Sequence, residues 1–291
     1  MWSEKRNDIT LGLWAVGNSA GFHAPIDARS AKNLIKTAYK KGIRSFDSAF
    51  SYGSDSLLYA ALRELGVRSD EVEIFEKIMP FRSLRRKAEA SLRALKRDCI
   101  DALIIHWPRE EELFQALREA EKLMDEKKFN AIGISNFPPE LAISIAKDFP
   151  ISYNEYFSSP TMLQSPIEGM RNIKYGIYSF GSLLKDEKPD GERGKLYYYE
   201  KEAYPHFIAL RRELKRLAEE KGVSEKDLLF SFAIYDRPYR VIIGARREDQ
   251  IDIPKTADLD SESYERIAQK GKEIQSFLKS DNIFSHNWRK G

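Results

Sequence analysis

Eight short apolar runs, separated by longer amphipathic segments, are the feature of this sequence that most restricts its fold. The runs are ITLGLWAV, RSFDSA, EIFEKI, ALIIHW, AIGIS, ISYNEY, YGIYSF and RVIIGA, at residues 9–16, 44–49, 73–78, 102–107, 131–135, 151–156, 175–180 and 240–245. Each run is rich in β-branched or aromatic residues and has the length of a strand. Runs that are apolar on both faces indicate a parallel sheet that is covered on both sides.

The segments between the runs place their apolar residues on one helical face, as Ala31, Leu34, Ile35 and Ala38 do. Strands alternating with helices predict either a closed (β/α)8 barrel or an open doubly wound sheet. The open sheet often carries GxGxxG after its first strand, and this sequence has no such motif. Eight units in about 250 residues therefore favour a (β/α)8 TIM barrel. We expect one domain over residues 1–291, with a C-terminal tail (about 279–291) that either folds over the mouth of the barrel or frays.

Composition excludes several classes of partner. The 48 basic and 45 acidic residues give a net charge of only +3, which provides no case for nucleic acid or an anionic membrane as the main partner. The start of the chain lacks a signal-peptide stretch, and no apolar run approaches the roughly 20 residues of a membrane span. We therefore expect a soluble, cytoplasmic protein. The single cysteine, Cys99, forbids an internal disulfide, and four scattered histidines without HExxH predict no metal site.

Polar side chains collect where the predicted strands end. Asp47, Lys77 and His106 lie near the ends of the second, third and fourth runs, and Tyr52 follows the second run in a loop. Each residue alone has an ordinary structural explanation, such as a helix cap or a strand-end lysine reaching for water. The carboxyl ends of parallel strands meet at one face of a barrel, so we expect these four side chains to converge on one pocket.

That convergence predicts acid–base chemistry at an oxygen atom. A tyrosine hydroxyl can protonate a developing alkoxide, although its ordinary pKa is about 10. A nearby lysine ammonium lowers that pKa, and an aspartate behind the lysine keeps the lysine charged. A histidine across the pocket can donate a hydrogen bond to a carbonyl oxygen. The set contains no strong nucleophile, so electrons for a reduction must come from a cofactor such as NAD(P)H.

Several motifs together carry a family resemblance. FDSAFSYGSD, FEKI, LIIHWP, GISNF, YSF and VIIGARREDQI, in this order and spacing, resemble the aldo-keto reductase superfamily from about Leu11 to Ile251. The resemblance implies a (β/α)8 fold, a monomer, and metal-free reduction of aldehydes and ketones with NADPH. It also implies that Asp47, Tyr52, Lys77 and His106 form a catalytic tetrad in which Tyr52 is the general acid.

The same resemblance implies which residues contact NADPH. Ser135 and Asn136 correspond to the pair that hydrogen-bonds the nicotinamide carboxamide, and Tyr178 corresponds to the aromatic residue on which the nicotinamide stacks. Arg246 and Arg247 lie in the loop that holds the 2′-phosphate, where they offer charge-assisted hydrogen bonds and favour NADP over NAD. The expected cofactor-binding set is Ser135, Asn136, Tyr178, Ser179, Gly244, Ala245, Arg246, Arg247 and Gln250.

The chain departs from the family pattern in three places. The glutamine that often lies on the sixth strand is missing from YNEY, where we expect Tyr153 or Asn154 to take its neighbourhood. The usual YSPL reads YSFGSLL, and no Glu-Asn pair is obvious after the phosphate loop. Four aromatic residues near the predicted mouth are expected either to form an apolar substrate pocket or to pack in the core: Trp14, Phe50, Phe81 and Trp107.

Two other function classes remain as alternatives. Asn154-Glu155 resembles the Asn-Glu pair of barrel glycoside hydrolases, with Glu76 or Asp47 as a partner, and retaining chemistry needs carboxyl groups about 5 Å apart. A lysine and a histidine at the centre argue against this function, and strand alternation leads us to expect Glu155 to face the helices. The third class is a non-enzymatic NADP-binding regulatory subunit, which has no need of all four tetrad groups.

Overall fold

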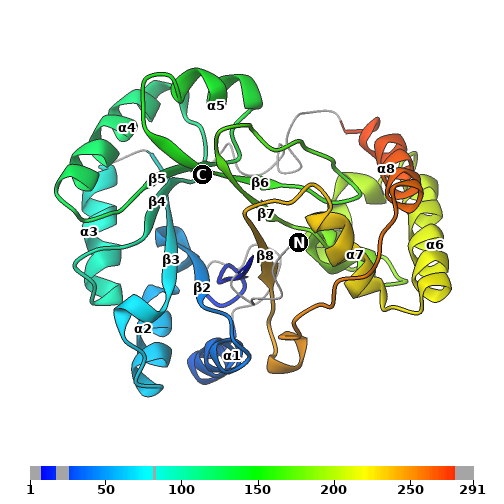
Figure 1. Ribbon diagram of the computed structural model, residues 1–291, viewed down its shortest axis with the longest axis horizontal. Coiled ribbons are helices and arrows are strands. Elements are labelled where there is room, and N and C mark those ends of the chain that lie inside the picture. Colours follow the sequence, from blue (N-terminus) through cyan, green and yellow to red (C-terminus); the bar gives the residue numbers. More distant parts are fainter. Residues whose placement is uncertain (1–7, 18–25, 81–82, 279–291) are drawn as a thin grey trace.

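Eight parallel strands close into a barrel in the computed structural model, which describes residues 8–17, 26–80 and 83–278. Each strand pairs with the next along the chain, and β1 pairs with β8 to complete the ring (Figure 1). The (β/α)8 barrel predicted from the sequence is therefore confirmed. The strands are β1 (Ile9–Gly12), β2 (Ser45–Ala49), β3 (Glu73–Ile78), β4 (Ala102–Ile105), β5 (Ile132–Ser135), β6 (Ile151–Phe157), β7 (Arg171–Tyr175) and β8 (Arg240–Gly244).

Helices surround the barrel and bury the faces that the sequence predicts. In α1, Ala31, Leu34, Ile35 and Ala38 are fully buried, and the Asp27 carboxylate caps the helix by accepting from two backbone N–H groups. The β6–β7 connection, residues 158–170, has no helix, whereas the β7–β8 connection contains two α-helices and three short 3-10 helices (Figure 1). The helices are α1 (Ala28–Lys40), α2 (Asp55–Glu64), α3 (Leu84–Leu95), α4 (Glu110–Asp125), α5 (Pro139–Ile145), α6 (Tyr204–Lys221), α7 (Glu225–Ile234) and α8 (Ser261–Gln275).

Large side chains fill the barrel interior below its mouth. The rings of Phe75 on β3 and Tyr153 on β6 meet edge to face, with centroids 5.2 Å apart. Side chains on a strand alternate between its two faces, so residues two positions further along point to the same side. Lys77 and Glu155 follow Phe75 and Tyr153 by two residues, and this period brings both charged groups to the carboxyl-terminal mouth.

The seventh strand begins four residues earlier and ends five residues earlier than the sequence predicts. We expected a strand over residues 175–180, but β7 ends at Tyr175, where it pairs with Phe157 of β6. Ser179, Phe180 and Gly181 have φ angles of 49°, 57° and 83°, which no strand can accommodate. The apolar character of YGIYSF comes from burial in a tight loop over the mouth, and burial alone does not distinguish such a loop from a strand.

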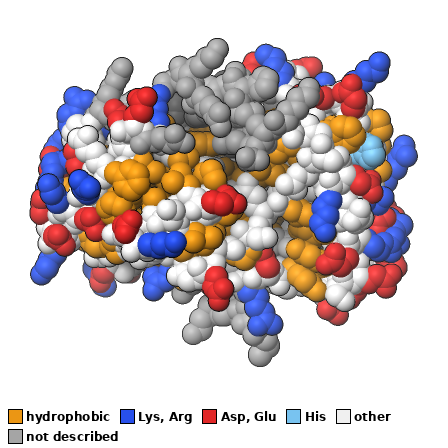
Figure 2. All heavy atoms as spheres, turned by 90° about the horizontal axis from the view of Figure 1, so that it is seen from above, with side chains coloured by type: hydrophobic (Ala, Val, Ile, Leu, Met, Phe, Trp, Pro, Cys, Tyr) orange, Lys and Arg blue, Asp and Glu red, His pale blue; other side chains and the backbone are white. Residues whose placement is uncertain are grey.

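The surface carries charges of both signs. On the face in Figure 2, Lys and Arg side chains are interspersed with Asp and Glu, and hydrophobic side chains gather near the middle. Among the helices of residues 8–17, 26–80 and 83–278, none is both long enough and apolar enough to cross a membrane.

Candidate active site

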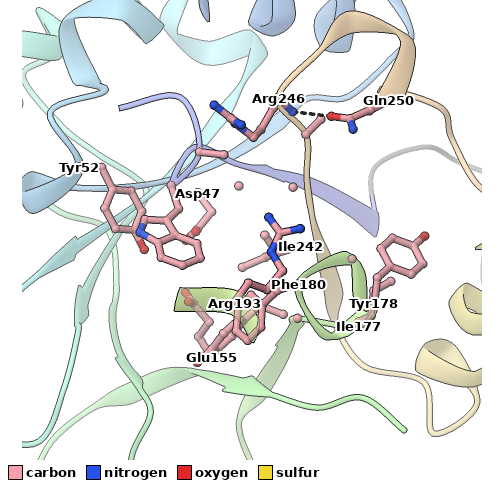
Figure 3. Close-up of a pocket in the computed structure, with 18 of the residues that line it drawn as sticks. Asp47, Tyr52, Glu155, Ile177, Tyr178, Phe180, Arg193, Ile242, Arg246 and Gln250 are labelled. Carbon is pink, nitrogen blue, oxygen red and sulfur yellow. Dashed lines mark hydrogen bonds between the residues drawn. The ribbon is translucent and has the colours of Figure 1, made fainter. Parts of the chain in front are cut away.

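A cavity of about 750 Å³ opens at the carboxyl ends of the strands, and all four predicted tetrad residues line it. Each one comes from a different element. Asp47 lies in the middle of β2, Tyr52 lies in the short 3-10 helix η2 (Phe50–Tyr52), Lys77 lies on β3, and His106 directly follows β4. Figure 3 shows Asp47 and Tyr52 beside each other in this cavity. The convergence expected from the strand ends is therefore present.

Lys77 is buried between two carboxyl groups. Its Nζ forms an ion pair with Asp47 and lies 3.5 Å from Oε1 of Glu155, and the three side chains are 2%, 6% and 4% exposed. Burial lowers the pKa of Lys77, but the neighbouring carboxyl groups, Asp47 first and Glu155 after it, outweigh this effect and leave the pKa above its ordinary value. The ammonium group therefore stays charged without contact with bulk water.

Tyr52 is held against both Lys77 and His106. The Nζ of Lys77 lies 5.3 Å from the centroid of the Tyr52 ring, and the His106 ring meets that ring edge to face at 5.7 Å. Burial raises the pKa of Tyr52 and outweighs the lowering by the Lys77 ammonium. The lysine lowers the pKa of Tyr52, as expected from the sequence, but burial raises it by more, so the hydroxyl stays protonated.

A glycine fixes the backbone position of Tyr52. A Cβ atom on Gly17 would lie 1.9 Å from the carbonyl oxygen of Tyr52, a separation that no side chain can tolerate. Gly17 therefore allows the loop after β1 to pack directly on the backbone of the candidate general acid.

His106 is a neutral imidazole. Burial, followed by the Lys77 charge, lowers its pKa well below the ordinary value. Its Nδ1 is buried without a hydrogen-bond partner among the described residues. A neutral imidazole donates from one ring nitrogen and accepts at the other, so His106 can donate to an oxygen atom in the cavity.

Glu155 lines the cavity, and the expectation that it faces the helices is wrong. It shares the inward face of β6 with Tyr153, whose ring packs against Phe75 inside the barrel, and Figure 3 draws Glu155 among the residues that line the cavity. Its Oε1 accepts from the Ser135 hydroxyl at 3.3 Å. Asn154 points out of the barrel, where its Nδ2 donates to Oδ1 of Asn172 at 3.0 Å. The side chain in the place that we expected Tyr153 or Asn154 to take is therefore a carboxyl group.

Asn136 joins the ends of several strands. Its Nδ2 donates to the carbonyl of His106 at 3.1 Å and to the Ser135 hydroxyl at 2.9 Å, and its Oδ1 accepts from the Tyr175 hydroxyl. Asn136 and Tyr175 line the cavity, whereas Ser135 is fully buried beside it. Sequence reasoning missed Tyr175 because it placed the strand end at residue 180 instead of at this residue.

Two residues near the seventh strand, Tyr178 and Ser179, were expected to contact the cofactor, but the structure places them differently. Tyr178 lines the cavity but lies in Figure 3 on the side away from Asp47 and Tyr52. Ser179 does not line the cavity; it is fully buried and exchanges hydrogen bonds with the hydroxyls of Ser159 and Thr161 at 2.9 Å and 2.8 Å.

A basic region forms another side of the cavity. Gly244, Ala245, Arg246, Arg247 and Gln250 all line it, as the motif predicts. The Gln250 Oε1 accepts from the backbone N–H groups of Arg246 and Arg247 at 2.8 Å and 3.2 Å, which fixes the loop (Figure 3). Arg193 and Lys226 also line the cavity. Both come from the long β7–β8 connection, which carried no sequence motif, so nothing in the sequence indicated them.

Aromatic residues form the remaining wall. Trp14 and Trp107 line the cavity, and the Trp14 ring meets Phe180 edge to face at 6.0 Å. Phe50 does not line the cavity and is 41% exposed. Phe81 and the predicted tail over 279–291 lie outside the described residues.

These features define a (β/α)8 barrel protein with a buried tyrosine–lysine–aspartate–histidine cluster at the face where barrel active sites form. The family model for the Aldo/keto reductase family matches residues 8–272, so the chain belongs to this family.

Similar proteins are known by sequence and by structure. The chain is 31% identical to a glyoxal reductase from Bacillus subtilis over 61% of this chain and 65% of the relative. It is 29% identical to a 9,11-endoperoxide prostaglandin H2 reductase from Trypanosoma cruzi over 47% of both chains, so these matches span about half to two thirds of the relatives. A glycerol dehydrogenase structure from Gluconobacter oxydans superposes with a TM-score of 0.76 at 21% identity, covering 94% of this chain and 93% of that one, and shows the same fold.

Proposed function

We propose that this protein is an oxidoreductase that reduces aldehydes or ketones to alcohols with NADPH, with Tyr52 as the general acid. One observation carries the proposal. Tyr52, Lys77, Asp47 and His106 meet in a buried cluster, and the same cavity has a basic wall that contains Arg246. The relatives named as reductases support the same class of activity.

The chain's own residues would handle the proton. The Tyr52 hydroxyl and an imidazole N–H of His106 would both donate to the carbonyl oxygen and hold it in place. As negative charge develops on that oxygen, Tyr52 transfers its proton to it. The Lys77 ammonium stabilises the phenolate left behind, and Asp47 keeps Lys77 charged. NADPH, when bound, supplies the hydride for the carbonyl carbon.

The lining of the cavity fits such a cofactor. Arg246, Arg247, Arg193 and Lys226 all line the cavity and bring positive charge that suits phosphate groups, and guanidinium groups recognise a phosphate through paired hydrogen bonds. The Asn136 amide lies near Tyr52 and His106, where a carboxamide would be held. Tyr178 offers an aromatic surface on the side of the cavity away from Tyr52.

Substitution of the candidate acid tests the mechanism. The loss of NADPH absorbance is followed with a panel of aldehydes that includes glyoxal and methylglyoxal, because relatives carry these names. Tyr52→Phe should lower kcat by at least about 10²-fold, the size of a general acid's contribution, while NADPH still binds. Undiminished turnover in this variant would remove Tyr52 from the mechanism.

Two further measurements separate this function from the alternative functions. Tight NADPH binding without turnover on any carbonyl would indicate a regulatory subunit. Release of nitrophenol from aryl glycosides, unaffected by NADPH, would indicate a glycoside hydrolase that uses Glu155. We also propose a cytoplasmic monomer that needs no metal, which size-exclusion chromatography and activity in a chelator would check.

A further inference from the structure

The mouth of the barrel holds one more carboxyl group than the proposed mechanism uses. Glu155 and Asp47 both contact the Lys77 ammonium, and all three side chains are almost completely buried. Lys77 can neutralise one carboxylate. The other positively charged groups that line the cavity come from the β7–β8 connection and from the loop after β8.

The hydrogen bonds of this cluster indicate that one of the two carboxyl groups carries a proton. Asp47 Oδ2 and Glu155 Oε2 are both buried, and neither has a donor among the described residues. The two side chains are nevertheless close enough to hydrogen-bond to each other. Two ionised carboxylates cannot form that bond because both are acceptors, whereas one proton between them makes one group a donor. Buried carboxyl pairs share a proton for this reason.

We propose that Glu155 is a positioning residue that carries a proton at neutral pH and shares it with Asp47, so that Lys77 and Tyr52 face a single negative charge. The part of this proposal that concerns the reaction rests on the proposed carbonyl reduction. The protonation itself does not.

The electrostatic surroundings support this state. Burial, and after it the charge of Asp47, raises the pKa of Glu155 to about 8, although Lys77 opposes the shift. The other titratable groups facing the pair are Tyr52, His106 and Tyr175, and burial keeps all three uncharged. The groups contributed by β5, Ser135 and Asn136, do not titrate. Among the described residues, no cation other than Lys77 forms an ion pair with Glu155.

Ionisation of Glu155 would make Tyr52 a weaker acid. When the pH rises through about 8, the Glu155 proton leaves to solvent and a second carboxylate remains beside Lys77. A negative charge on Glu155 raises the pKa of the Tyr52 hydroxyl further. Proton donation to a carbonyl oxygen should then slow, so the protein would reduce carbonyls best below pH 8.

Infrared spectroscopy of the protein without NADPH or substrate tests the protonation directly. Wild type should show the carbonyl stretch of a protonated carboxylic acid that disappears with a midpoint near pH 8. The band should be absent from the spectrum of Glu155→Gln. Glu76→Gln is the matched control, because Glu76 is also buried but accepts from the Ser91 hydroxyl at 2.8 Å outside the cavity. Absence of the Glu155 band at pH 6 in the folded protein overturns the proposal.

The pH profile of kcat/KM tests the catalytic part. In wild type, kcat/KM should fall about tenfold per pH unit above pH 8, as one lost proton requires. Glu155→Gln should remove this decline, Glu155→Asp should restore it at a shifted pH, and Glu76→Gln should leave it in place. A decline that persists in Glu155→Gln overturns the catalytic part. If no carbonyl is reduced at all, the proposed function fails, while the infrared result still decides the protonation.

Discussion

The hydroxyl of Tyr175 donates a hydrogen bond to Oδ1 of Asn136, which links the end of β7 to the end of β5. Asn136 in turn donates to the carbonyl of His106 beyond β4 at 3.1 Å. Asn136 holds a left-handed backbone conformation at φ 66°, which this residue type tolerates better than most others. One amide side chain therefore sets the relative positions of three strand ends around the candidate active site.

Tyr175→Phe should disturb both stability and cofactor affinity. The change leaves Asn136 Oδ1 without its donor, which costs about 1 kcal/mol of unfolding free energy for a buried hydrogen bond. An amide that is no longer held should also bind NADPH several-fold more weakly. Urea unfolding and fluorescence titration with NADPH measure the two effects. Unchanged affinity at reduced stability would show that Asn136 is held in place by its other hydrogen bonds.

Lys77→Met should make stability depend strongly on pH. Removing one partner of a buried ion pair costs about 3–5 kcal/mol, because Asp47 and Glu155 lose their counter-ion. Their folded-state pKa values then rise still further above the unfolded values. Between the unfolded-state and the folded-state pKa values of these two groups, the folded state holds more protons than the unfolded state. The free energy of unfolding therefore falls as the pH rises through this range.

Urea unfolding at pH 5 and pH 8 checks this prediction for Lys77→Met. The deficit relative to wild type should be larger at pH 8 than at pH 5. Lys40→Met, at an exposed position near the end of α1, is the control and should show little deficit at either pH. An equal deficit of Lys77→Met at both pH values would mean that the carboxyl groups do not depend on this lysine.

Gly17→Ala should lower activity more than its small size suggests. The added methyl group would collide with the Tyr52 carbonyl oxygen, so the backbone of Tyr52 must move. Overpacking of this kind costs about 1–3 kcal/mol, and a misplacement of about 1 Å at a reacting group can cost about 10²-fold in rate. Thermal unfolding and kcat are measured together. A variant with a lowered Tm and full kcat would show that the loop after β1 yields instead of Tyr52.

Arg246→Ala should weaken NADPH binding much more than NADH binding. A charge-assisted hydrogen bond contributes about 1.5–3 kcal/mol, so the loss for NADPH should be at least about tenfold. Equal losses for the two nucleotides would place Arg246 away from the 2′-phosphate.

Asp249→Asn should have the opposite effect on NADPH. Asp249 pairs with the Arg247 guanidinium at 3.0 Å, and both side chains are exposed. Breaking an exposed pair costs about 0.2–1 kcal/mol, so releasing Arg247 should improve NADPH affinity by about two- to fivefold. Titrations in low salt measure the change, and no improvement would indicate that Arg247 does not reach the cofactor.

The barrel and the core of its site could be predicted from the sequence because both depend on local patterns. Eight strand runs alternate with amphipathic segments, and parallel strands place their carboxyl ends on one face. Asp47, Lys77 and His106 lie near those ends, so their convergence follows from the fold class alone. Arg246 and Arg247 were found in the same way, at the end of β8.

Glu155 and Tyr175 show where the sequence was insufficient. The direction of Glu155 depends on which residues of β6 face inward, and the pairing of β6 with β7 decides where Tyr175 ends its strand. A shift of one residue turns a side chain to the other face, and YGIYSF is as apolar as a strand although it forms a loop.

The sequence by itself determined the number of strands and the chemical types gathered at their ends, because hydrophobic periodicity is a property of neighbouring residues. Only the tertiary structure decided how those groups are charged. Lys77 was expected to make Tyr52 more acidic, yet burial keeps the Tyr52 hydroxyl protonated and raises the pKa of Glu155 to about 8. Desolvation depends on the whole surroundings of a group, and those surroundings come from segments far apart in the chain.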